Sequence, residues 1–316
     1  MNKPLVSVLM ITYNHENFIR EAIEGVLMQK TVFSIELIIG EDCSTDNTRK
    51  IVVEYAEKYP KVIRPLLSEN NLGMMKNFIE TMQAASGKYI AICEGDDYWT
   101  DPLKLQKQVD FLEANEEYSM CFHKSKVLNQ NTSGFIFEQP NINHNKTYTI
   151  NDLFLGNPIA TASVIFKREF IKSIPDWFSK VPFGDYALYL IILDRSKQNA
   201  IYLSDVMSVY RLHSGGVHGS AHFSNVGYVK AYKQHVNFWK VISENYLSDY
   251  KKEINNAIVN ANTNVLNYML YDGKLNDALV WNMKFLFSTK FNYFKINTKL
   301  FKKIIKLTLK SIIKRF

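Results

Sequence analysis

The sequence predicts an α/β fold with a mostly parallel sheet, followed by a C-terminal helical region. Two observations lead to this prediction. Through the first hundred residues, short apolar runs alternate with amphipathic segments, which is the βαβα pattern of a parallel sheet. After residue 222, apolar residues recur at helical spacing instead. With 316 residues, 47% of them hydrophobic, the chain can bury the core of one domain of about 220 residues plus an appendage.

The elements of the first half follow one another regularly. Strands are predicted at residues 5–11, 35–40, 62–67 and 89–93, with helices at 16–29, 45–59 and 74–85 between them. Pro102 fits the first position of a fourth helix, residues 103–113, and Asp101 fits its N-cap. Because right-handed crossovers bring the ends of parallel strands to one edge of the sheet, the polar residues that follow these strands should lie together.

The second half continues with fewer strand signals and then with helices. A strand is predicted at residues 121–128, an irregular insertion from there to residue 146, and a strand that returns to the sheet at 160–166. A strongly apolar helix is predicted at 187–193, and three further helices at 225–244, 251–271 and 275–287. The predicted organisation is a domain at 1–222, a helical subdomain at 223–296 and a basic amphipathic helix at 297–316.

Three carboxylates crowd the end of the strand at 89–93, in the tetrapeptide EGDD at residues 94–97. Taken alone, this tetrapeptide is better explained as a polar turn that caps the next helix. The first two strands also end in polar residues, however, namely Thr12, Glu41 and Asp42. Ligands of open α/β sheets bind outside the carboxyl ends of the strands, where one or two carboxylates can hold Mg²⁺ or Mn²⁺ together with phosphate oxygens. The three strand ends together therefore favour a metal diphosphate site.

Four motifs occur in order across about 100 residues, a specific pattern. They are LVSVLMITYN at 5–14, IIGEDCSTDNT at 38–48, NLG at 71–73 followed by Lys76 and Asn77, and EGDDYW at 94–99. These motifs resemble those of family 2 inverting glycosyltransferases. The resemblance implies the glycosyltransferase type A fold, with a Rossmann-like, mostly parallel sheet, and a nucleotide-sugar donor.

The resemblance also implies roles for the residues that match the motifs. The nucleoside would be held by Thr12, Tyr13, Glu41 and Asp42, with Lys76 also in the nucleotide-sugar site, and the metal, ribose and diphosphate by Glu94, Asp96 and Asp97. Glu41 and Glu94 stand where the family most often has Asp, so each carboxylate is shifted by about one methylene. Asp96 is therefore the favoured metal ligand. The identity of the donor nucleobase is left open.

Transfer with inversion needs a carboxylate that takes the proton of the acceptor hydroxyl. Asp185 is the candidate, in the segment PFGDY at 182–186 ahead of the apolar helix. An Asp at this place can also be a simple N-cap. The resemblance favours the catalytic base, since the family places its base at an acidic residue that begins a helix in this region. Trp177 and Phe178 precede it, and we favour core packing over sugar stacking for them.

Residues 209–219 (VYRLHSGGVHG), which follow a predicted strand, are predicted to form a flexible, cationic loop with three glycines. An Arg, or a His bound to a metal, can stabilise the negative charge that a leaving diphosphate develops. The Tyr-Arg-x-His pattern is similar to a segment that closes over the diphosphate in many family members. The resemblance therefore implies a diphosphate contact for Arg211 and a metal contact for His213, with His218 as a weaker candidate.

The cysteines and the charge distribution indicate where the protein works. Cys43, Cys93 and Cys121 are odd in number and widely spaced, which favours a reducing cytoplasm. No run reaches the roughly 18 to 20 apolar residues of a spanning helix, so we expect a protein that is neither secreted nor transmembrane. Residues 284–316 hold 10 of the 38 Lys and Arg and none of the 31 Asp and Glu, so the rest of the chain has a net charge of −3.

The basic C-terminal segment is also amphipathic. In residues 297–316 apolar side chains fill one helical face and lysines the other, which is typical of a helix that lies in an anionic membrane interface. A terminal helix docked on the domain and a nucleic-acid-binding segment are the alternatives. We expect no nucleic-acid partner, because no domain-type motif for one is present.

The sequence thus predicts a cytoplasmic, peripheral-membrane inverting glycosyltransferase on the inner face of the cell membrane. It would use Mn²⁺ or Mg²⁺ and transfer a hexosyl or N-acetylhexosaminyl group, with a UDP-sugar as the favoured donor, to a hydroxyl of a glycan or lipid-linked acceptor in surface polysaccharide synthesis. A sugar nucleotidyltransferase is an alternative, but it should have a Gly-rich basic loop after its first strand, and TYNH at 12–15 is not one. A non-catalytic, membrane-bound sugar-binding module is another, and it would not need Asp185.

Overall fold

The computed structural model of the chain describes residues 3–130, 134–213, 216, 225–246 and 248–288. The chain divides into two compact units. The first consists of Met1–Ser179 and Gly184–Leu212, and the second of Lys180–Phe183 and His213–Phe316. The division after Leu212 falls somewhat before the boundary predicted at residue 222.

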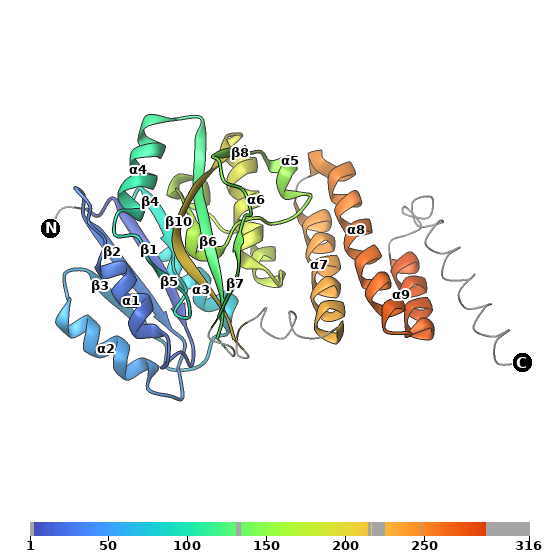
Figure 1. The fold of residues 1–316 in the computed structure, drawn as a ribbon, viewed down its shortest axis with the longest axis horizontal. Helices are drawn as coiled ribbons and strands as arrows, with labels where there is room; N and C mark the ends of the chain where they lie inside the picture. Colours follow the sequence, from blue (N-terminus) through green and yellow to red (C-terminus); the bar gives the residue numbers. More distant parts are fainter. Residues whose placement is uncertain (1–2, 131–133, 214–215, 217–224, 247, 289–316) are drawn as a thin grey trace, which may run out of the picture. The chain divides into compact units, whose positions relative to one another are not determined.

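The first unit is built on one ten-stranded sheet (Figure 1). Its strands are β1 (Val6–Thr12), β2 (Ile35–Glu41), β3 (Ile63–Leu67), β4 (Tyr89–Ile92), β5 (Tyr98–Trp99), β6 (Tyr118–Asn129), β7 (Gly134–Gln139), β8 (Lys146–Tyr148), β9 (Ile165–Lys167) and β10 (Asn199–Leu212). The order is β3-β2-β1-β4-β9-β6-β10-β5, while β7 pairs with β6 and β8 with β10. Strands β3, β2, β1 and β4 are parallel, as are β6 and β10, whereas β9 runs antiparallel between β4 and β6. The predicted fold class, a mostly parallel sheet, is confirmed.

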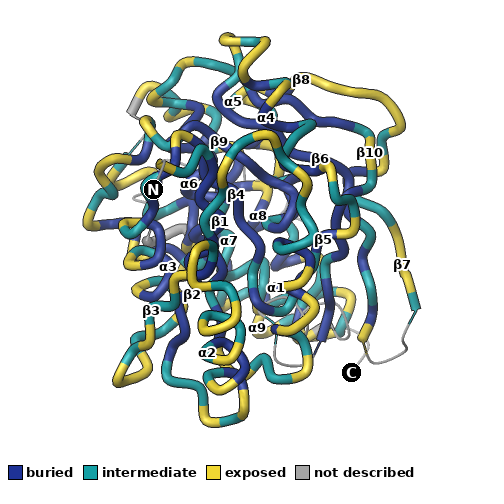
Figure 2. Tube along the Cα trace, turned by 90° about the vertical axis from the view of Figure 1, so that its left-hand side faces the viewer, coloured by how far each residue is buried: buried dark blue, intermediate teal, exposed yellow. Residues whose placement is uncertain are grey.

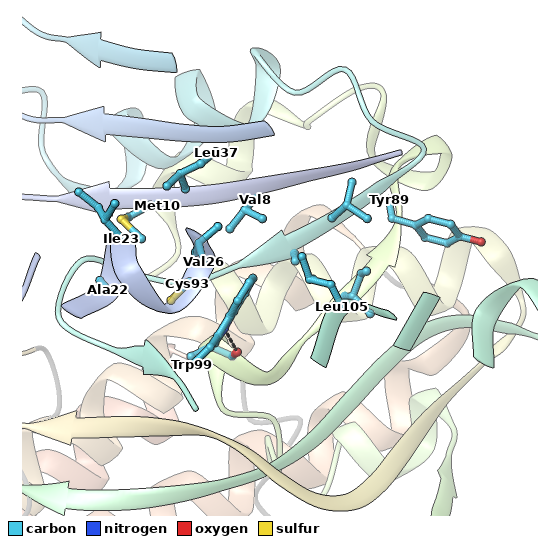
Figure 3. Packing of buried hydrophobic residues seen from close by; sticks show 14 of the residues in the cluster. Val8, Met10, Ala22, Ile23, Val26, Leu37, Tyr89, Cys93, Trp99 and Leu105 are labelled. Atoms are coloured by element: carbon cyan, nitrogen blue, oxygen red, sulfur yellow. Dashed lines mark hydrogen bonds between the residues drawn. The ribbon is translucent and has the colours of Figure 1, made fainter. Parts of the chain in front are cut away.

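Helices cover both faces of this sheet. They are α1 (Ile19–Leu27), α2 (Thr48–Lys58), α3 (Met74–Gln83), α4 (Lys104–Ala114), the short α5 (Ile150–Leu153) and α6 (Gly184–Ser196). Successive residues of a strand face opposite sides, so Leu37 of β2 belongs to a core cluster with α1, α2 and α4, whereas Gly40 faces α3. Figure 3 shows part of that cluster, with Val8 of β1, Val26 of α1 and Trp99 of β5. Strand β4 is buried at every residue and β1 at all but one (Figure 2), and strands buried on both faces appear in sequence as continuous apolar runs.

Two predictions for the middle of the chain are wrong. The segment up to residue 146 is not irregular, because it contributes β7 and β8 to the sheet. Strand β7 gives little period-two signal because its consecutive residues Phe135, Ile136 and Phe137 are all exposed. The predicted strand at 160–166 is correct only at its end. Residues 161–163 form a 3₁₀ turn, which the Ser163 hydroxyl closes by donating to the Ala160 carbonyl at 2.7 Å.

The fourth helix begins one residue later than predicted. Asp101 does act at its start, because its carboxylate accepts the backbone N–H of Leu103 at 2.8 Å. The same carboxylate also pairs with Lys107, at 2.8 Å. Lys104 is the first helical residue and Leu103 the N-cap, so the positions predicted for Asp101 and Pro102 are wrong, although Asp101 still serves the helix rather than the candidate site.

The described part of the second unit contains three helices, α7 (Asn225–Asn245), α8 (Lys251–Tyr271) and α9 (Leu275–Ser288). They match the three predicted helices to within one residue at each end. Tyr228 and Tyr232 of α7 stack on Tyr268 of α8, with ring centroids 4.9 and 5.6 Å away. The indole N–H of Trp281 in α9 donates to Asn262 of α8 at 2.8 Å. The predicted basic helix at 297–316 lies outside the described residues.

Among the described residues, no helix combines the length and the apolar character that are needed to cross a membrane.

Gly40 gives a direct test of how closely α3 packs on β2. A Cβ at this position would overlap the Thr81 hydroxyl and the Asn77 amide oxygen, and Asn77 itself donates to the Gly40 carbonyl at 2.8 Å. We predict that Gly40→Ala lowers the free energy of unfolding by about 1–3 kcal/mol through overpacking. Chemical denaturation measures this, with Gly156→Ala as the control, because a Cβ there meets no atom within 4 Å. Equal losses in the two variants would contradict the packing described.

Candidate functional site

The acidic loop, residues 94–97, connects β4 to β5 and lies against the end of β1. The backbone N–H of Gly95 donates to the Ile11 carbonyl at 3.0 Å. A Cβ on Gly95 would lie only 2.7 Å from the Thr12 hydroxyl oxygen and 3.0 Å from Nδ1 of His15. Only glycine allows this approach. The structure therefore brings together two of the predicted strand ends, those of β1 and β4.

The three carboxylates of the acidic loop converge. Glu94, Asp96 and Asp97 each offer an oxygen within 4.8 Å of the others. Burial raises the pKa of Glu94 to about 8, helped by the negative charges of Asp96 and then of Asp185. Burial also raises the pKa of Asp97 well above its ordinary value, and Asp96 and Glu94 add to the effect. The Oδ2 atom of Asp97 is buried and has no hydrogen-bond partner among the described residues.

These observations fit a divalent cation. Oxygen ligands at this spacing suit Mg²⁺ or Mn²⁺, and a cation would relieve the repulsion between buried carboxylates. His15, which follows β1, brings its Nε2 to 3.9 Å from the Asp96 carboxylate. His15 was not predicted as a site residue from the sequence. Its place one residue after the motif TYN, at the same sheet edge, was the available signal.

Arg211 lies in strand β10, which continues to Leu212, and not in a flexible loop as predicted, and from this strand it holds the acidic loop. Its backbone N–H donates to Oδ1 of Asp97 at 2.8 Å, and its guanidinium donates to the backbone carbonyl of Asp96 at 2.6 Å. The guanidinium also pairs with Glu21 of α1. The predicted contact of Arg211 with a diphosphate stays a prediction, and the structure adds a role in fixing the loop.

Asp185 lies in the first turn of α6 and does not precede the helix as an N-cap would. Its Oδ2 accepts hydrogen bonds from the Asn157 amide at 3.4 Å and from the Thr161 hydroxyl at 3.3 Å. Because Asp185 contributes to the raised pKa of Glu94, its carboxylate is close enough to the acidic loop to affect it electrostatically. Asn157 and Thr161 were missed from the sequence, since nothing in their local pattern connects them to Asp185.

The carboxylates after β2 hold loops in place. Glu41 is fully buried, accepts the Ser44 N–H at 2.6 Å and pairs with Arg49. Asp42 accepts the backbone N–H groups of Leu72 and Gly73, at 2.6 and 2.9 Å, where the chain enters α3. The nucleoside contacts predicted for these two residues remain predictions, and each carboxylate also orders a loop beside the sheet edge.

For the other predicted site residues, the structure gives the position but does not test the predicted contact. Tyr13 directly follows β1 and is 42% exposed. Lys76 lies on α3 with its side chain 63% exposed, and its ammonium group is 3.8 Å from the Glu80 carboxylate. His213 belongs to the second unit, so its predicted metal contact stays a prediction, and His218 lies outside the described residues. Trp177 and Phe178 are buried, which confirms core packing for both.

Comparison with known proteins agrees with the fold and the motifs. The model of the family described as glycosyl transferase family 2 matches residues 7–172. The uncharacterised protein Rv1520 of Mycobacterium tuberculosis is 39% identical over 217 residues, which are 69% of this chain and only 61% of that relative. The UDP-Glc:alpha-D-GlcNAc-diphosphoundecaprenol beta-1,3-glucosyltransferase WfgD of Escherichia coli is 30% identical over 217 residues, covering 69% of this chain and 81% of that protein.

A solved structure shows the same fold. The mannosyltransferase PcManGT of Pyrobaculum calidifontis, in complex with GDP-Man and Mn²⁺, has a TM-score of 0.57 and 17% identity. The similarity covers 100% of this chain and 89% of that one. At this identity the likeness supports the fold alone.

The raised pKa of Glu94 predicts how the cation-free protein responds to pH. A carboxyl whose pKa rises from 4.5 to about 8 on folding contributes stability below its unfolded pKa and loses it as the pH rises through 8. With a chelator present, Glu94→Gln should therefore melt like the wild type near pH 4.5 and at a higher temperature near pH 8. Thermal melts at the two pH values measure this.

Glu113→Gln is the control with the opposite sign. The hydrogen bond from Lys88 lowers the pKa of Glu113, so its contribution is present above the unfolded pKa and is lost as the pH falls. This variant should melt at a lower temperature than the wild type near pH 8. If Glu94→Gln also melted at a lower temperature than the wild type near pH 8, the acidic loop would not be under electrostatic strain.

Proposed function

Because the chain belongs to glycosyl transferase family 2, we propose that it transfers a sugar, with inversion, from a nucleotide-sugar donor to a hydroxyl of an acceptor. One observation carries the proposal: a cluster of three carboxylates suited to a divalent cation lies within electrostatic reach of a separate carboxylate, Asp185. The two sets of carboxylates suit the two tasks of the reaction, holding the diphosphate of the donor and accepting a proton from the acceptor.

Asp185 would act as the general base. Asn157 and Thr161 both donate to its Oδ2, which turns the carboxylate to one orientation. The carboxylate would take the proton of the acceptor hydroxyl as the new glycosidic bond forms. Helix α6 is buried along most of its length, so this carboxylate stands on a rigid support.

The acidic loop would hold the cation through Glu94, Asp96 and Asp97, with Asp96 as the principal ligand. When bound, the cation supplies positive charge that offsets the charge developing on the diphosphate. The loop itself is prevented from opening by the Gly95 contact with β1 and by the bonds from Arg211.

We propose a UDP-sugar as the donor, carrying a hexose or an N-acetylhexosamine. The name of the E. coli relative specifies UDP-Glc, and that relative is 30% identical to this chain over 217 residues.

We propose a glycan or lipid-linked acceptor in the synthesis of a surface polysaccharide, and a position on the inner face of the cell membrane. The E. coli relative is named for an acceptor on diphosphoundecaprenol, which is a membrane lipid. The amphipathic pattern and the ten basic residues of segment 284–316 would suit attachment to an anionic bilayer.

The test of the proposed chemistry is Asp185→Asn. The amide cannot accept the proton, so transfer should fall on the order of 10²-fold or more, while nucleotide affinity and melting temperature change little. Asp194→Asn is the matched control, since Asp194 lies on the same helix and pairs with Lys197. Transfer by both variants at the wild-type rate would exclude Asp185 as the base.

The proposed membrane attachment is tested by deleting residues 297–316. Each basic residue near an anionic surface contributes about 1 kcal/mol and is screened by salt, so the truncated protein should no longer sediment with anionic vesicles. Activity on a soluble acceptor should persist. A second variant replaces five lysines by glutamine, namely Lys302, Lys303, Lys306, Lys310 and Lys314. Vesicle binding that survives both changes would contradict the proposal.

A further inference from the structure

A buried arginine connects the acidic loop to a surface carboxylate on α1. The Arg211 side chain is only 3% exposed, and it forms an ion pair with Glu21, whose side chain is 55% exposed. The pair joins residues 190 positions apart in the sequence. A guanidinium removed from water needs an opposite charge close by, because the cost of burying it alone is several kcal/mol. Glu21 supplies that charge.

Aromatic rings limit the positions open to the guanidinium. Its central carbon lies 4.3 Å from the centroid of the Tyr98 ring and 5.3 Å from that of Phe18. Tyr98 directly follows the acidic loop, and Phe18 directly precedes α1. The two rings and Glu21 together hold the guanidinium where its Nη1 group donates to the loop.

Arg211 then fixes two consecutive residues of the acidic loop. One guanidinium nitrogen donates to the backbone carbonyl of Asp96 at 2.6 Å, and the Arg211 backbone N–H donates to the Asp97 carboxylate at 2.8 Å. The guanidinium therefore binds the loop at Asp96 through the backbone carbonyl and not through the carboxylate.

We propose that Glu21 is a positioning residue for the acidic loop, acting through Arg211 to keep the carboxylates of Asp96 and Asp97 aimed at the divalent cation. This inference rests on the proposed function, since it assumes that the loop binds a cation. Without Glu21, Arg211 would lose this ion pair while it stays in contact with Asp96 and Asp97, and one of their carboxylates would replace the missing partner. A carboxylate paired with Arg211 would be lost to the metal.

The test compares Glu21→Gln with Glu24→Gln in the full-length protein. Glu24 lies one turn further along α1 and is also exposed, but its carboxylate accepts the Tyr55 hydroxyl at 2.5 Å and, among the described residues, forms no hydrogen bond or ion pair with the loop. Mn²⁺ is titrated into each protein with UDP present, and free Mn²⁺ is followed by electron paramagnetic resonance. Glu21→Gln should weaken Mn²⁺ binding about 10- to 100-fold, as the loss of a residue behind metal ligands commonly does. Glu24→Gln should bind like the wild type.

Two further measurements separate positioning from a general structural effect. The metal-free Glu21→Gln protein should melt at the wild-type temperature, and Glu21→Asp, which keeps the charge, should recover part of the Mn²⁺ affinity. Hydrogen exchange should show the backbone N–H of Arg211 less protected in Glu21→Gln than in Glu24→Gln.

The outcomes distinguish this inference from the proposed function. Equal Mn²⁺ affinities and equal protection in Glu21→Gln and the wild type would overturn the role of Glu21 and leave the proposed function standing. A wild-type protein that binds no Mn²⁺ in the presence of UDP would overturn the cation site, and the role of Glu21 with it.

Discussion

Repulsion between the carboxylates of Glu94, Asp96 and Asp97 is the constraint on which the rest of the site depends. Burial itself raises the pKa values of Glu94 and Asp97, because it takes their charged forms out of water, and the repulsion between the carboxylates, which little water screens, adds to the effect. A loop under such strain would open toward solvent unless the surrounding structure held it. The same strain favours a bound cation, so the interactions that keep the loop closed also prepare it for a metal.

The closed loop is held from two sides. On one side it lies against the end of β1, where Gly95 has no side chain to keep it from Thr12. On the other side Arg211 binds it from β10, with its own charge balanced by Glu21. Strands β1 and β10 are far apart in the order of the sheet, so the loop is positioned by the whole sheet and not by local turn geometry.

Much of the fold and part of the site could be predicted from the sequence, because their signals are local. Strands buried on both faces are continuous apolar runs, and parallel strands place their ends at one edge, so grouping Thr12 with Asp96 required no structure. Contacts between residues far apart in the sequence could not be predicted from such local patterns. The pairing of Glu21 with Arg211 and the hydrogen bonds of Asn157 to Asp185 depend on how distant segments pack. The exposed strand β7 was missed because it has no buried face to impose a pattern.

Nucleotide binding in the presence and absence of Mn²⁺ tests the central claim most directly, namely that the acidic loop binds a cation that holds the donor diphosphate. The measurement is the melting temperature of the wild type and of Asp96→Ala with UDP, dTDP or GDP, each with Mn²⁺ or with a chelator. The account predicts that UDP raises the melting temperature of the wild type only when Mn²⁺ is present, and that Asp96→Ala shows no Mn²⁺-dependent rise. Equal protection by UDP with the chelator, or an unchanged response in Asp96→Ala, would contradict it.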